Sequence, residues 1–126
     1  MNIEQFLEYC NKKPFVTEEF PFGPDNLVLK VKGKIFAITD LNETPLKVNL
    51  KCDPEQAEIL RDKYEQVKPG YHMNKKHWNT VEFDAKLSLK LLKEWIDHSY
   101  LSVVETLSKS LKQEVEQELL RNNSSK

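Results

Sequence analysis

Two apolar runs joined by a short glycine-containing connection constrain the fold of this chain most. Residues 27–31 and 35–39 are strand-like, and Lys32-Gly33-Lys34 lies between them. This arrangement is typical of a β-hairpin. A third run, 46–52, alternates apolar and polar residues, which predicts a strand with Lys47, Asn49 and Lys51 on one face and core residues on the other. The centre of the fold is therefore an antiparallel sheet with one apolar face.

Helical patterns flank the predicted strands. Apolar residues recur at three- and four-residue spacing over 2–12, and Asp53 followed by Pro54 has the form of a helix start, which predicts a helix over 54–66. The same spacing from Ser88 to Leu111 predicts one long amphipathic helix. Residues 113–126 lose apolar density, so we expect this tail to fray.

The resulting order is α-β-β-β-β-α-β-β-α, because residues 15–22 and the two halves of 67–83 also read as strand-like. Grouped strands between helices favour an α+β fold, with an antiparallel sheet and helices packed on one face. A chain of 126 residues has the size of one domain. We expect a single domain over 1–112 followed by the tail 113–126.

Composition narrows the functional classes. No apolar run approaches the roughly 18 residues that a membrane-spanning helix needs, and the N-terminus does not resemble an export signal. We therefore expect a cytoplasmic protein without a membrane partner and favour a monomer. The two cysteines, Cys10 and Cys52, are too few for a disulfide framework and are expected to be free core thiols. The net charge of −1 argues against tight non-specific DNA binding, so any electrostatic site must be local.

Residues 69–81 concentrate the groups that bind ligands. This segment begins with a Pro-Gly turn signal and then contains cations, imidazoles, amides and two aromatic side chains. Lys30, Lys32 and Lys34 surround the predicted hairpin turn, and Lys75 and Lys76 sit at a second turn. Lysines on turns can contact DNA phosphates and side-chain amides can contact base edges, which makes these lysines and the nearby asparagines the candidate nucleic-acid-binding residues. They are Lys30, Lys32, Lys34, Asn74, Lys75, Lys76 and Asn79.

Other interpretations of the same residues stay open. The lysines can simply solubilise sheet edges, and Trp78 can cover the core. Alternatively, the segment from Tyr71 to Thr80 can line a pocket for a small anion or contact a protein, with Tyr71, His72, His77 and Trp78 as its candidate ligand-pocket residues. A convex lysine face would favour nucleic acid, whereas a concave pocket would favour a small ligand.

Catalysis and metal binding have weaker support. His72 and His77 are the acid–base candidates, yet no phosphate loop, nucleophile elbow or carboxylate pair accompanies them. Zinc needs three or four converging ligands, and the remaining candidates lie in distant segments. We expect no enzyme activity, no metal and no cofactor. Ser99 and Tyr100, in the last helix, are expected to bond or pack against the sheet.

Four blocks of this sequence resemble the MmcQ/YjbR family of small bacterial proteins. They are Phe22-Gly23, the run 30–37, the run 51–55, and above all the run 69–81; residues 97–100 add a fifth. The resemblance covers about residues 1–112. It implies a fold similar to frataxin and CyaY and a DNA-binding role of the double-wing type. The first helix has only Glu4 and Glu8 against Lys12 and Lys13, so iron binding of the frataxin kind is not supported.

Overall fold

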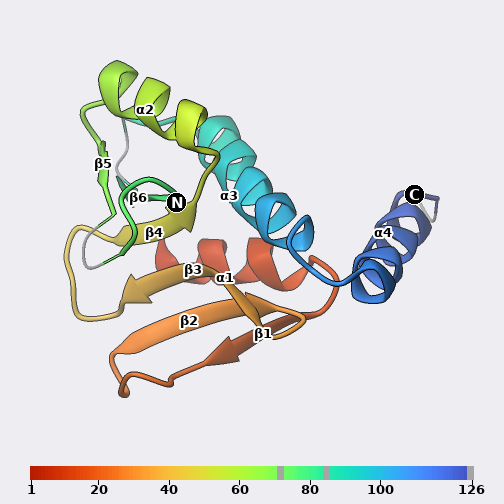
Figure 1. Cartoon of the computed structure of the whole chain (residues 1–126). Coiled ribbons are helices and arrows are strands. Elements are labelled where there is room, and N and C mark those ends of the chain that lie inside the picture. Colours follow the sequence, from red (N-terminus) through yellow and green to blue (C-terminus); the bar gives the residue numbers. More distant parts are fainter. Residues whose placement is uncertain (71–72, 84–85, 125–126) are drawn as a thin grey trace.

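The computed structural model describes residues 1–70, 73–83 and 86–124. Over these ranges, six strands form one antiparallel sheet in the order β1-β2-β3-β4-β6-β5. The strands are β1 (Val16–Glu19), β2 (Asn26–Val31), β3 (Lys34–Asp40), β4 (Lys47–Lys51), β5 (Val67–Pro69) and β6 (Trp78–Glu82). The helices are α1 (Ile3–Asn11), α2 (Pro54–Lys63), α3 (Leu89–Val104) and α4 (Lys109–Ser124) (Figure 1). The predicted α+β class and antiparallel sheet are confirmed.

The β2–β3 hairpin forms where the sequence predicts it. Its connection is the two-residue turn Lys32-Gly33, with φ values of 50° and 83°. Positive φ at both central positions matches the twist of the adjoining strands, and glycine adopts it without a Cβ penalty.

The apolar face of the sheet is covered by α1, α2 and α3. Phe6 of α1 and Ile96 of α3 are fully buried in the same core cluster as Val48 of β4, and Ala57 of α2 joins them. The ring of Phe6 meets Phe83 edge-on at 5.6 Å. Helices packed on one face are therefore confirmed for this part of the fold.

The predicted long helix over 88–111 is wrong at its C-terminal end. Helix α3 stops at Val104, and a second helix, α4, begins at Lys109. The Thr106 hydroxyl donates to the Val103 carbonyl at 2.7 Å, and Ser108 accepts the Leu111 amide at its side chain, as a helix N-cap does. The apolar spacing continues across the break, so periodicity alone missed it.

Helix α4 adds one element to the predicted order and includes most of the tail expected to fray. It lies at the turn end of the β2–β3 hairpin (Figure 1), where Glu114 pairs with Lys32 at 2.8 Å and Val115 is fully buried. A CyaY-like order and the boundary at residue 112 stay predictions. Among the described residues, no helix combines the length and apolar character needed to cross a bilayer.

Candidate functional site

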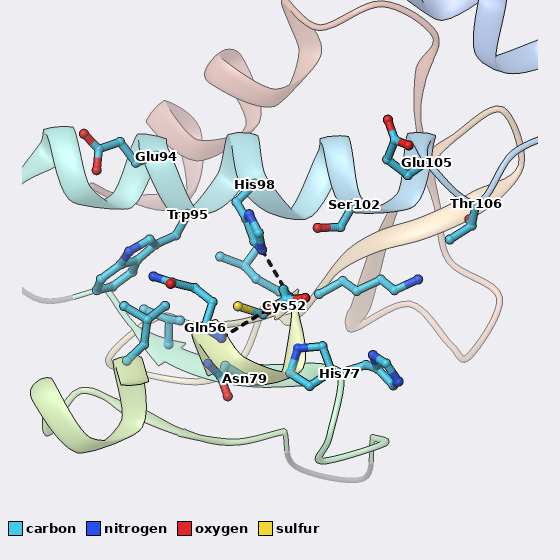
Figure 2. Close-up of a pocket in the computed structure, with 16 residues that line it drawn as sticks. Cys52, Gln56, His77, Asn79, Glu94, Trp95, His98, Ser102, Glu105 and Thr106 are labelled. Carbon is cyan, nitrogen blue, oxygen red and sulfur yellow. Dashed lines mark hydrogen bonds between the residues drawn. The ribbon is translucent and has the colours of Figure 1, made fainter. Parts of the chain in front are cut away.

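A pocket of about 740 Å³ lies between α2, α3 and the end of β4 (Figure 2). Leu50, Cys52, Leu60, Val81 and Trp95 form its apolar lining. The polar lining residues come from three elements and the segments beside them. They are Lys51, Asp53, Gln56, His77, Asn79, Glu94, His98, Ser102, Glu105 and Thr106.

Helix α3 bridges β3 and β4 beside the pocket-lining residue Lys51. The β3–β4 ladder ends at the pair Ala37 and Leu50, where the β2–β3 register shifts at a bulge. The Ser99 hydroxyl of α3 accepts the Lys51 amide at 2.8 Å and donates to the Phe36 carbonyl at 2.5 Å. This hydroxyl replaces a direct bond between the strands, so both buried backbone groups stay satisfied as the strands diverge.

Helix α3 also fixes the start of α2. The Asp53 backbone amide donates to Nε2 of His98 at 3.1 Å, which requires that nitrogen to carry no proton. The Asp53 carboxylate then accepts the Gln56 amide at 3.3 Å and caps α2. The dashed bonds in Figure 2 show this chain of contacts across the pocket wall.

The direction of the side chains gives the pocket its chemical character. In Figure 2, Trp95 and His98 extend from α3 toward the cavity, whereas the carboxylates of Glu94 and Glu105 point away from it. Glu105 is also paired with Lys112 at 2.7 Å. These two carboxylates therefore do not face the cavity, whereas Lys51, His77 and Gln56 bring hydrogen-bond donors to its lining.

The thiol in this pocket is not an activated nucleophile. Cys52 is 6% exposed, and burial raises the pKa of its thiol to about 11, with the nearby Asp53 carboxylate acting in the same direction. A protonated thiol packs as a small apolar group. Cys52 and Cys10 are both free and buried, as predicted.

Arg61 of α2 organises the turn that carries His77. Its guanidinium donates to the Asn79 side chain at 2.6 Å, to the Trp78 carbonyl at 3.3 Å and to the Lys75 carbonyl. The His77 carbonyl accepts the Cys52 amide at 2.7 Å, which places this histidine at the pocket. Sequence reasoning missed Arg61, because a lone arginine in a helix carries no motif.

The candidate nucleic-acid residues divide into two groups. The hairpin lysines are engaged: Lys30 pairs with Glu19 at 3.1 Å, Lys32 pairs with Glu114, and Lys34 donates to the Thr106 carbonyl at 2.8 Å.

The second group lies at the turn before β6. Lys75 and Lys76 are exposed, whereas Asn74 uses its side chain to accept the Lys76 amide at 2.9 Å. Asn79 is 2% exposed and donates to the Ala57 carbonyl at 3.3 Å, so its amide is part of the core. Lys34 is exposed as well, but its ammonium group is bonded to Thr106, so the turn before β6 presents the exposed pair whose ammonium groups have no partner in the part of the chain that the structure describes.

The candidate pocket residues are also separated by the structure. His77 lines the pocket, whereas Trp78 pairs with Lys51 in the sheet and is not among the described lining residues. Tyr71 and His72 lie outside the described residues. Within the described ranges, no three side chains of the His, Cys, Asp and Glu types cluster as metal ligands.

Comparison with known proteins agrees with the sequence blocks. A family model described as YjbR matches residues 11–102. The Escherichia coli uncharacterised protein YbdF is 43% identical over 97 residues, covering 76% of this chain and 79% of that protein. The E. coli uncharacterised protein YjbR is 35% identical over 107 residues, covering 85% and 91%.

Solved structures are similar in overall fold. The crystal structure of Deinococcus radiodurans protein DR2400, described as a DUF419 domain, has a TM-score of 0.86 and 37% identity, covering 91% of this chain and 88% of that one. A crystal structure of a Pseudomonas syringae protein has a TM-score of 0.69 and 30% identity, covering 80% and 97%.

Proposed function

This chain belongs to the YjbR family, and we propose that it is a binding protein that holds a small organic acid in the pocket between α2 and α3. The observation that carries the proposal is the orientation of the charged side chains. The carboxylates of Glu94 and Glu105 point out of the cavity, and that of Asp53 is bonded to the start of α2. An anionic head group can thus contact the donors of Lys51, His77 and Gln56 without facing the carboxylates of Glu94 and Glu105.

The hydrogen-bond donors of the pocket suit the acidic head group of a ligand, and its apolar lining suits the apolar body of the same molecule. Lys51, His77 and Gln56 line the pocket from the β4 end, the turn before β6 and α2. Leu60 and Trp95 supply the apolar side, and the Trp95 ring is held edge-on by Tyr64 at 5.1 Å. The volume of about 740 Å³ falls within the range of about 300–1,000 Å³ found for small-molecule pockets.

Two of the pocket's potentially reactive groups, Cys52 and His98, favour binding over catalysis. The Cys52 thiol is kept protonated by burial, and Nε2 of His98 already accepts the Asp53 amide. Neither group is available to start a reaction at neutral pH.

The proposal is tested with phenylacetate and phenyl phosphate as probes, measured by isothermal titration calorimetry. Lys51→Met keeps an unbranched apolar stem but removes the ammonium group and its charge, so affinity should fall about tenfold, the equivalent of one charge-assisted hydrogen bond. Lys47→Met, on the same strand but outside the pocket, is the matched control and should bind as the unaltered chain does. Equal affinity in both variants, or no heat of binding in the unaltered chain, would contradict the proposal.

Nucleic acid at the turn before β6 is the second candidate. It rests on Lys75 and Lys76, which are adjacent and exposed on a turn whose backbone is held by Arg61. A basic turn whose backbone is anchored in this way can contact phosphates. A double-wing mode has less support, because the lysines of the other turn are bonded within the protein. A cytoplasmic location stays a prediction.

A further inference from the structure

One end of the sheet exposes large apolar side chains that the pocket does not use. Phe20 and Phe22 lie in the β1–β2 loop, and Leu41 follows β3; their exposed fractions are 48%, 65% and 42%. The two segments are joined, because the Leu41 amide donates to the Asp25 carbonyl at 2.8 Å. We refer to Phe20, Phe22 and Leu41 as the aromatic end. None of the three lines the pocket.

The loop holds these side chains outward through its own hydrogen bonds. The Gly23 amide donates to the Phe20 carbonyl at 3.4 Å, and the Asn26 amide donates to the Gly23 carbonyl at 3.3 Å. Gly23 has a φ of 120°, a conformation that side chains disfavour, so glycine lets the loop turn here. A folded loop that keeps two phenylalanines in water is costly unless another surface covers them.

The two segments that form the aromatic end carry charged side chains of one sign. Residues 14–29 and 35–46 contain acidic side chains but no lysine or arginine. Lys30 and Lys47, which lie just beyond these two segments in the sequence, pair with Glu19 and Glu43 respectively. Glu18, Asp25 and Asp40 remain without an ion pair among the described residues. The aromatic end thus combines apolar area with a negative border.

From this combination we propose that the aromatic end docks a protein segment whose apolar side chains are flanked by lysine or arginine. Burial of the phenylalanine rings supplies affinity, and the acidic border selects the partner by charge. Nucleic acid and anionic lipid are disfavoured, because both meet a border of like charge. The inference is independent of the pocket, since the two sites share no residue.

The test uses a short synthetic amphipathic peptide of leucine and lysine, with a leucine–glutamate peptide as its charge-reversed counterpart. Binding is followed by amide NMR shifts of the ¹⁵N-labelled protein. The basic peptide should shift amides of the β1–β2 loop and of Leu41 in a saturable way, and added salt should weaken it. The acidic peptide should leave those amides unchanged.

Paired variants locate the contact. Phe22→Ser with Leu41→Ser should reduce affinity for the basic peptide at least about tenfold, as expected when apolar anchors are removed. Ile59→Ser with Leu101→Ser is the matched control, because these side chains are also exposed, at 55% and 48%, but lie on α2 and α3.

Three results would overturn the inference. They are absence of saturable binding at about 1 mM peptide, equal binding of the acidic peptide, or equal loss in both double variants. Sedimentation that depends on concentration and is abolished by the Phe22 and Leu41 changes would assign the aromatic end to a second copy of the chain instead.

Discussion

Replacing Ser99 by alanine should destabilise the protein far more than the loss of one surface hydroxyl. Ser99 is fully buried, and its oxygen bridges the Lys51 amide at 2.8 Å and the Phe36 carbonyl at 2.5 Å. Removing it leaves a donor of β4 and an acceptor of β3 facing each other across a gap that the strands cannot close, because α3 is packed against them.

The magnitude follows from the two groups left without partners. An unsatisfied buried polar group costs about 1–3 kcal/mol, so two such groups with partial relaxation cost about 2–4 kcal/mol. A domain of this size is stable by roughly 5–15 kcal/mol, so the loss is a large fraction of the total. The melting temperature should fall by about 10 °C.

The assay is urea denaturation of the unaltered chain, Ser99→Ala and a control. Ser102→Ala is the matched control, because this serine is three residues further along α3, is only partly buried and lines the pocket instead of bridging the strands. It should change stability by less than about 0.5 kcal/mol. Amide exchange at Lys51 should also accelerate in Ser99→Ala. Equal stability of the two variants would refute the bridging role of Ser99.

Three further predictions concern single features. Cys52 should resist iodoacetamide at pH 7, and rapid alkylation of the folded protein at neutral pH would contradict this. The pKa of this thiol is about 11 in the folded protein and 9.0 in the unfolded chain, so its contribution to stability is complete below pH 9.0 and is lost as the pH rises through 11. Gly70→Ala should lower the free energy of unfolding, measured by urea denaturation, by about 1–3 kcal/mol, because a Cβ at position 70 would lie 2.8 Å from the Cβ of Trp78. An unchanged midpoint of the urea transition would show that the turn adapts. Lys75→Glu with Lys76→Glu should abolish any salt-dependent retention of DNA in fluorescence anisotropy while changing stability by less than about 1 kcal/mol; unchanged retention excludes this turn.

The sheet and its hairpins were predictable because local patterns determine them. Alternation over 46–52 predicted β4, and Gly33 between two apolar runs predicted the β2–β3 turn. The end of α3 was not predictable from periodicity, because Leu107 and Leu111 keep the helical spacing while Ser108 starts a new helix. A single serine inside a repeat of apolar residues is a weak sequence signal for the start of a new helix.

The site was only partly predictable, for a different physical reason. His77 belongs to a dense polar segment and was identified from sequence, whereas Gln56, His98 and Ser102 occur singly in helices. Their convergence depends on how α2 and α3 cross the end of β4, which is a tertiary property. The hairpin lysines looked accessible in the sequence, and Glu19 and Glu114 engage two of them only after folding.

A comparison of ligands that share one apolar body and differ in head charge tests the small-acid pocket most directly. Phenylacetate and phenethylamine serve this purpose, with amide and indole NMR signals as the readout. We expect phenylacetate to shift the Trp95 indole and the Gln56 amide in a saturable manner, while phenethylamine at equal concentration does not. Stronger shifts from the amine, or no response of Trp95 to either molecule, would contradict the account.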